Sequence, residues 1–157
     1  MNDIYKDNFK TSLSYAQKLF IWSNMVSIFI FTLVGKELDD KITIPFFSYT
    51  IAATSGMKIV LALYMVFGFL LVFSLKAASD NLKNISDNKL KEALLLSPSV
   101  FTGHVVLRIL AVILSLIVMV KSTFDLFGGD LSTALLVSGI FSIGHIIAIY
   151  FVIKIQA

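Results

Sequence analysis

Four long apolar stretches constrain the fold of this 157-residue chain more than any other feature. They cover residues 19–34, 59–75, 100–120 and 131–153, and nearly all charged side chains fall between them. Hydrophobic residues make up 57% of the chain, above the roughly 45–50% of a soluble domain. A helix that crosses the ~30 Å hydrocarbon core of a bilayer needs roughly 20 mostly apolar residues. The sequence therefore predicts an all-α integral membrane protein, an antiparallel bundle of four transmembrane helices in a single domain, 1–157.

Residues that begin and end helices mark the limits of the last two stretches. Ser97 is suited to cap the third helix, with Pro98 at its first position, where a missing N–H is tolerated. Gly128 and Gly129 predict a turn before the fourth helix, and Asp130 can cap that helix. These boundaries are the best defined in the chain.

The distribution of lysine predicts the orientation of the helices, because cytoplasmic segments of membrane proteins carry an excess of lysine and arginine. With a cytoplasmic N-terminus, eight lysines fall inside: Lys6, Lys10, Lys18, Lys76, Lys83, Lys89, Lys91 and Lys154. Four fall outside: Lys36, Lys41, Lys58 and Lys121. This bias favours both termini in the cytoplasm, with the plasma membrane as the expected location.

Two segments that flank the apolar stretches have helical patterns. Residues 1–15 place Tyr5, Phe9 and Leu13 four residues apart, which predicts a short interfacial helix that leads into the membrane. Residues 76–96 also show apolar residues on one helical face, with a break at Ser86-Asp87. This segment is either a solvated connector at the bilayer surface or a docking site for a cytoplasmic partner.

The segment 35–58, on the external side in this orientation, has a different character. Residues 42–49 are β-prone and aromatic, and Pro45 interrupts them. An aromatic loop at the headgroups is the favoured interpretation. A two-stranded piece and a re-entrant dip are the alternatives.

The sequence carries no motif of a known enzyme class, so we expect a non-catalytic protein. It lacks a Gly-rich phosphate loop, G-x-S-x-G and H-E-x-x-H, and no apolar stretch contains an acidic residue. It has no cysteine. His104 and His145 fall on different predicted helices without a neighbouring carboxylate, so we expect neither a metal nor a cofactor. The net charge of +3 reflects flanking lysines, and no nucleic-acid partner is expected.

A few polar residues fall inside the apolar stretches and are the candidate functional residues. Arg108 is the only arginine, and it lies eight residues into the predicted third helix, or ~12 Å from its cytoplasmic end. His145 lies at a similar depth in the fourth helix. Asn24 completes a polar layer in the inner half of the bilayer, with Gly68 at the same level on the second helix.

Two helical faces extend this layer. On the third helix, His104, Arg108, Ala111 and Ser115 follow one side. On the fourth helix, the corresponding side carries Ala134, Ser138, Ser142 and His145. Small residues four apart let helix backbones approach closely in lipid, so Ala111, Ala134, Ser138 and Ser142 are expected at a helix-packing or oligomer interface.

Arg108 decides between two functional hypotheses. A cation in a span is costly, and no acidic residue lies in any span to neutralise it. Arg108 therefore faces water or an anion, or its side chain reaches the cytoplasmic headgroups. The first option favours a homo-oligomeric channel or pore lined by Arg108, His104, Ser115, His145 and Asn24. The alternative is a non-catalytic accessory or scaffold subunit of a larger membrane complex.

Overall fold

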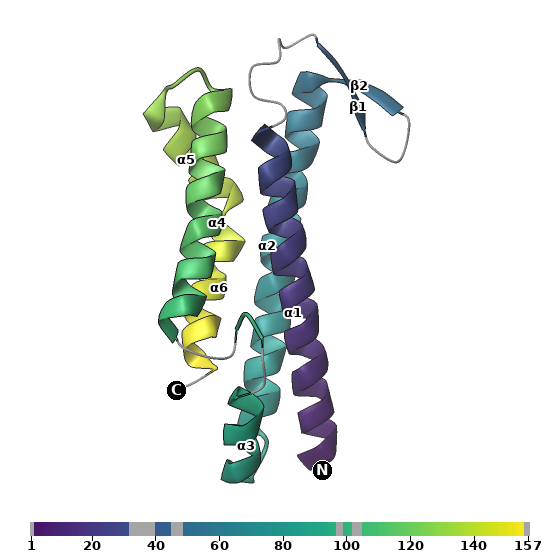
Figure 1. The fold of residues 1–157 in the computed structure, drawn as a ribbon, viewed down its shortest axis with the longest axis vertical. Helices are drawn as coiled ribbons and strands as arrows, with labels where there is room; N and C mark the ends of the chain where they lie inside the picture. Colours follow the sequence, from purple (N-terminus) through teal and green to yellow (C-terminus); the bar gives the residue numbers. More distant parts are fainter. Residues whose placement is uncertain (1, 32–39, 45–48, 97–98, 102–104, 156–157) are drawn as a thin grey trace.

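Six helices and one short β-hairpin make up the described part of the chain (Figure 1). The structure is a computed structural model, and it describes residues 2–31, 40–44, 49–96, 99–101 and 105–155. The elements in chain order are α1 (Asn2–Phe31), β1 (Lys41–Ile44), β2 (Tyr49–Ala52), α2 (Ala53–Lys83), α3 (Asn88–Leu95), α4 (Val105–Leu126), α5 (Leu131–Phe141) and α6 (Ile143–Lys154). The all-α class predicted from the sequence is thus confirmed.

The helices form two layers that lie side by side. One contains α1 and α2, which run along each other in opposite directions, and the other contains α4 with α5 and α6 (Figure 1). Helix α2 contacts α1 along one side and α6 along another, so it joins the two layers. The start of α1 and the end of α6 lie toward the same end of the molecule (Figure 1).

Helix α1 runs without a break from Asn2 to Phe31. The separate N-terminal interfacial helix predicted for residues 1–15 is therefore wrong. The predicted apolar face does exist, but Phe9 and Leu13 are buried against the chain itself rather than facing a bilayer. Their partners come from the second half of α2, which extends well beyond the apolar stretch that predicted it.

The segment 76–96 is helical with one break, as its pattern indicates. Helix α2 continues to Lys83, and α3 begins after Asp87, whose side chain accepts hydrogen bonds from the backbone N–H groups of Lys89 and Leu90. At the break, Ser86 donates to the side-chain oxygen of Asn2 through its backbone N–H and its hydroxyl. This contact ties the start of α1 to the end of α2.

The apolar core of this end of the molecule lies among α1, α2, α3 and α6. Its buried members are Phe9, Leu13, Ala16, Phe20, Leu71, Leu75, Ala78, Leu82, Ile85, Leu94, Phe101, Ala148, Val152 and Ile155. Half of them come from the polar segments 1–18 and 76–96, so these segments contribute to a shared interior. A second, smaller cluster of Val60, Leu61, Tyr64 and Met119 lies nearer the hairpin end of α2.

The segment between α1 and α2 contains the two-stranded piece, which was one of the alternatives to an aromatic loop. Strands β1 and β2 pair antiparallel, with Lys41 opposite Ala52 and Ile44 opposite Tyr49. The backbone N–H of Ala53 donates to the carbonyl of Asp40 at 2.8 Å and closes the hairpin onto α2. Pro45 and residues 46–48 lie outside the described residues.

The third predicted helix does not begin at residue 100. Val100 and Phe101 lie in a turn, and α4 begins at Val105. The predicted cap at Ser97 and Pro98 lies outside the described residues. Arg108 is the fourth residue of the described part of α4. The depth of ~12 Å expected for this arginine stays a prediction, because residues 102–104 lie outside the described residues.

The fourth predicted helix is two helices. Helix α5 ends at Phe141, α6 begins at Ile143, and their axes differ by 58°. The turn before α5 agrees with the sequence: Gly128 and Gly129 have φ of 66° and 86°, and Asp130 caps the helix by accepting from the N–H groups of Ser132 and Thr133. The single helix expected over 131–153 is replaced by a bend at Ser142.

Among the described residues, one helix qualifies as a membrane span by its own length and composition. It is the part of α2 from Ser55 to Lys83. In its most apolar 18-residue window, 33% is buried inside the chain. Helices α5 and α6 qualify when they are counted together as one bent span.

Two glycines determine how closely α2 and α6 approach. A Cβ atom added to Gly144 would lie 2.4 Å from the carbonyl carbon of Gly68 and 2.7 Å from the backbone nitrogen of Phe69. A Cβ added to Gly68 would lie 2.7 Å from Nδ1 of His145. The two backbones are therefore in direct contact at this crossing, a distance that only glycine permits.

Replacing Gly144 with alanine should open the contact between α2 and α6. The added methyl group meets backbone atoms that cannot rotate away, so we expect the Gly144→Ala chain to be less stable by about 1–3 kcal/mol. Gly139→Ala is the matched control, because Gly139 is also helical and nothing lies within 4 Å of an added Cβ. Thermal unfolding in lipid nanodiscs should rank Gly144→Ala below the parent chain and Gly139→Ala at or above it. Equal melting temperatures for the two variants would contradict the close contact.

The cap at Asp130 should make the start of α5 sensitive to acid. Its pKa lies below the ordinary 3.8 because the Thr133 hydroxyl and the backbone N–H groups of Ser132 and Thr133 donate to the carboxylate. A carboxyl group whose pKa is lower in the folded than in the unfolded chain stabilises the folded chain at pH values above its unfolded-state pKa. This stabilisation is lost as the pH falls through the folded-state pKa. Asp130→Asn keeps a capping oxygen without a titrating group. Melting temperatures measured from pH 6 downward should show a smaller decline in Asp130→Asn than in the parent chain; parallel declines would contradict the prediction.

Candidate functional site

Three polar side chains from three helices meet at the centre of the described structure. Tyr64 comes from α2, Ser115 from α4 and His145 from α6, and all three are fully buried. The hydroxyl groups of Tyr64 and Ser115 lie 3.3 Å apart and form a hydrogen bond. The rings of Tyr64 and His145 stack with centroids 4.1 Å apart and an angle of 17° between their planes. We refer to these residues as the Tyr64 cluster.

The α2–α6 crossing positions the cluster. Tyr64 lies one helical turn before Gly68, and His145 directly follows Gly144. Because Gly68 has no side chain, the imidazole of His145 occupies the space beside it and reaches the face of Tyr64. The same close approach that joins the two backbones therefore brings the two rings together.

The imidazole of His145 is packed but not hydrogen-bonded. Neither Nδ1 nor Nε2 has a partner among the described residues, although the side chain is fully buried. Stacking uses the faces of the rings and leaves the in-plane nitrogens unused. A neutral imidazole offers one donor and one acceptor, so His145 supplies two unused hydrogen-bonding positions in the interior of the chain.

The other residues of the predicted polar layer do not join the cluster. Asn24 is half-buried and donates to the carbonyl of Phe20 in its own helix at 2.8 Å. His104 lies outside the described residues. Arg108 lies in the first turn of α4, and the structure does not describe its side chain. Of the five residues proposed to line a pore, the structure brings Ser115 and His145 together within one chain.

The small residues predicted for helix packing lie at contacts within the chain. Ala134 and Ser138 are buried on α5, and Ser142 is buried at the bend. The hydroxyl of Thr123 on α4 donates to the carbonyl of Ala134 at 3.3 Å, which joins α4 to α5. Ala111 lies on α4, where the structure does not describe its side chain. These buried positions are used in packing α5 against its own neighbours.

Tyr64 was not identified as a candidate from the sequence. It lies within an uninterrupted apolar stretch, where tyrosine is ordinary, and its partners are 51 and 81 residues away along the chain. The available signal was its spacing of four residues from Gly68, which had been placed at the level of His145. A phenol one turn from a glycine that faces a histidine is a recognisable pattern once the two helices are known to be neighbours.

Comparison of the chain with known protein families, with curated proteins and with solved structures finds no match. Within the part of the chain that the structure describes, no three histidine or acidic side chains lie close enough to hold a metal ion together. The Tyr64 cluster is therefore interpreted from its own geometry, as a stack between two helices with an unused pair of imidazole nitrogens.

Substitution of His145 should separate the role of its ring from that of its nitrogens. His145→Phe keeps a flat ring against Tyr64 and removes two unpaired polar atoms, so we expect unchanged or increased stability. His145→Ala removes the ring and leaves a void, which should cost about 1–3 kcal/mol. Thermal unfolding in nanodiscs distinguishes the two. If Phe destabilised the chain as much as Ala, the nitrogens would be engaged in a bond and the stacking interpretation would be wrong.

Proposed function

We propose that the chain crosses a membrane four times, with both termini in the cytoplasm. Helix α2 and the bent pair of α5 and α6 have the required length and composition. The remaining two spans would be the second half of α1 and most of α4, since residues 19–31 and 109–120 contain no charged side chain. Four crossings are consistent with termini at the same end of the molecule (Figure 1).

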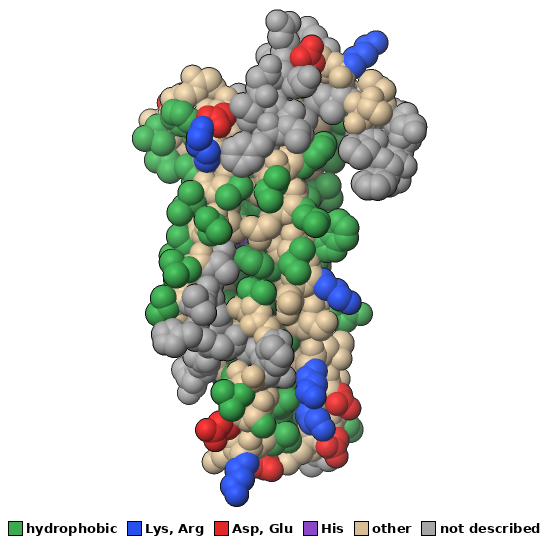
Figure 2. All heavy atoms as spheres, in the orientation of Figure 1, with side chains coloured by type: hydrophobic (Ala, Val, Ile, Leu, Met, Phe, Trp, Pro, Cys, Tyr) green, Lys and Arg blue, Asp and Glu red, His purple; other side chains and the backbone are tan. Residues whose placement is uncertain are grey.

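The exposed surface of these helices supports the proposal. Large apolar side chains face outward along the middle of the molecule, where lipid would cover them. They include Ile21, Trp22, Met25, Ile28, Leu63, Val66, Phe73, Val106, Leu110, Leu114, Ile117, Leu136, Ile140 and Ile147. On the face drawn in Figure 2, most charged side chains gather toward the two ends, whereas the middle is largely apolar.

The function that we propose is that of a non-catalytic membrane subunit, which acts by binding another protein. The observation that carries this choice is the burial of Ser115 and His145 within one chain, where they contact Tyr64 rather than a lumen. The end of the molecule that α1, α2 and α3 form would then be accessible to a partner protein, and its surface carries both lysine and acidic side chains. Lys83 and Lys89 are exposed there on segment 76–96, for which the sequence leaves a docking site as the alternative to a solvated connector.

A homo-oligomeric channel remains the second hypothesis, and it is less well supported. Its main argument is an arginine within a span, whereas two of the residues proposed to line the pore, Ser115 and His145, are buried within one chain. A pore between copies would have to be lined by residues exposed on one chain. Self-association through the exposed apolar faces of α4 and α5 is compatible with either function.

Neutralising the charged end should release the partner. We expect a tagged chain, purified from its native membranes in mild detergent, to retain a second protein in a fixed ratio. Lys83→Gln with Lys89→Gln should reduce the retained amount severalfold. Lys41→Gln with Lys58→Gln removes the same charge from exposed positions at the hairpin end and is the matched control.

The same purification tests the alternatives. A chain recovered only with copies of itself, together with ion flux after reconstitution, would favour the channel. Equal losses in both double variants would contradict the docking of a partner at segment 76–96. Reporter fusions at Asp40 and at the C-terminus test the orientation, and activity of a cytoplasmic reporter at Asp40 alone would show it to be reversed.

A further inference from the structure

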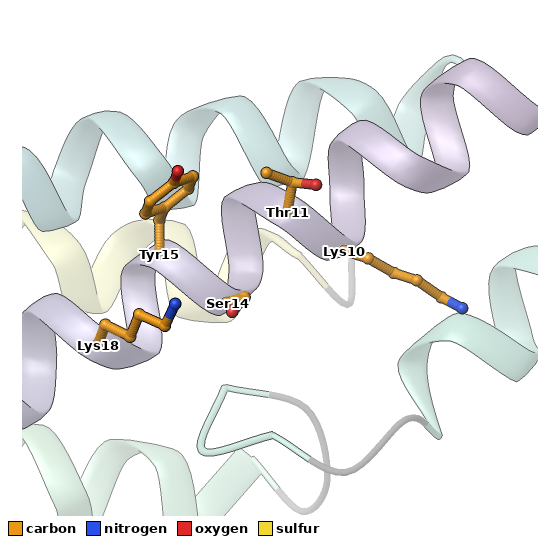
Figure 3. A pocket seen from close by; sticks show the side chains of 5 residues that line it. All are labelled: Lys10, Thr11, Ser14, Tyr15 and Lys18. Atoms are coloured by element: carbon orange, nitrogen blue, oxygen red, sulfur yellow. The ribbon is translucent and has the colours of Figure 1, made fainter.

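A hollow of about 320 Å³ lies on the outer side of α1, away from the Tyr64 cluster. Figure 3 shows the five side chains that line it: Lys10, Thr11, Ser14, Tyr15 and Lys18. All five belong to one helix and recur at spacings of three and four residues, so they share one face. The Lys18 side chain turns back toward Ser14 and Tyr15, whereas that of Lys10 extends away from them (Figure 3).

The lining of this hollow is suited to an anion. It combines two ammonium groups with three hydroxyl groups, and it contains no carboxylate. Lys10 and Lys18 make no ion pair among the described residues, whereas Lys6, one turn before Lys10, lies 4.0 Å from Asp3. The Lys18 ammonium instead lies 5.8 Å from the centre of the Tyr15 ring. Ammonium and hydroxyl groups together form the usual donor set for a phosphate group.

The same face of α1 becomes apolar immediately after Lys18. Ile21, Trp22, Met25 and Ile28 continue the spacing of three and four residues, and each is between 45% and 58% exposed. From Lys18 to Ile28 the helix rises ~15 Å, about half of the ~30 Å hydrocarbon core. The face thus has a basic, hydroxyl-rich end and an apolar end as long as one leaflet.

We propose that this face binds an anionic phospholipid, with its phosphate group at Lys10, Ser14 and Lys18 and an acyl chain along Trp22 and Met25. The inference rests on the membrane placement proposed above, which puts Lys18 at the cytoplasmic headgroups. That leaflet is rich in anionic lipid, and each lysine near it adds a preference of about fivefold. Asp7, one turn before Lys10, would lie beyond the headgroup in water.

A lipid fits this face better than free phosphate because the charged hollow opens directly onto apolar surface. A free anion would use only the lysine and hydroxyl end, whereas the acyl chain of a bound phospholipid would also pack on the four large apolar side chains. A phospholipid covers both ends at once, with its charge and its acyl chain in the order in which the helix presents them. The side chains of Thr11 and Ser14 would add hydrogen bonds to the phosphate or glycerol oxygens.

Trp22 provides a local probe of this binding, because it is the only tryptophan in the chain and lies one turn after Lys18. The purified full chain is placed in phosphatidylcholine vesicles that contain a minor fraction of phosphatidylglycerol with brominated acyl chains, which quench tryptophan fluorescence on contact. We expect quenching several times stronger than random mixing of the lipids predicts. Brominated phosphatidylcholine at the same fraction should quench only as random mixing predicts.

Lys10→Gln with Lys18→Gln should abolish the excess quenching by phosphatidylglycerol. Lys41→Gln with Lys58→Gln removes the same charge from exposed positions at the hairpin end and should leave the excess unchanged, and circular dichroism checks that all chains remain helical. High salt should weaken the excess. Excess quenching that survives in Lys10→Gln with Lys18→Gln, or that disappears equally in the control pair, would overturn the proposal.

Two further outcomes assign failure to its source. Inorganic phosphate is added in place of chloride, so that the ionic strength stays constant. If it removed the excess quenching, the hollow would bind a free anion and the lipid assignment would be wrong. If alkaline carbonate extracted the chain from the vesicles, the membrane placement itself would fail. A chain that resists extraction but shows no preference for phosphatidylglycerol would refute only the lipid site.

Discussion

The contact between Gly68 and Gly144 is the constraint on which the rest of the structure depends. Both layers of helices meet there, because α2 contacts α1 on one side and α6 on the other. An added Cβ at Gly144 would be 2.4 Å from the backbone of α2, so the two helices are as close as their main chains permit. In lipid, where apolar burial adds little between helices, such close packing is a main source of association.

This crossing also accounts for the bend between α5 and α6 and for the position of the polar residues near that bend. With α6 held against α2 at Gly144, a straight continuation toward the hairpin end would follow a different path from that of α5, which packs on α4 through Ala134 and Thr123. The change of 58° at Ser142 reconciles the two contacts. It places His145 between the layers, where it stacks on Tyr64 instead of facing outward.

The sequence predicted what depends on local chemistry and missed what depends on distant contacts. The cap at Asp130 and the helical nature of segment 76–96 follow from neighbouring residues, and both agree with the structure. The bend at Ser142 and the Tyr64 stack depend on which helices are neighbours, and apolar patterns in a membrane span carry little of that information. The turn at Val100 and Phe101 was missed because these two residues are as apolar as the helix that follows them.

The apolar and polar parts of the long helices indicate that the two ends of the molecule face different surroundings. The first half of α1, the last turns of α2 and helix α3 pack together through Phe9, Leu82 and Leu94. Charged residues lie outside this core. Such an interior does not need lipid, so this end can stay folded while it is exposed to water or to a partner. The exposed apolar face of α1 begins only after Lys18, at Ile21 and Trp22. One helix therefore passes from a water-facing core through a basic, hydroxyl-rich turn to an apolar face, and that turn is where a charged headgroup would meet the chain.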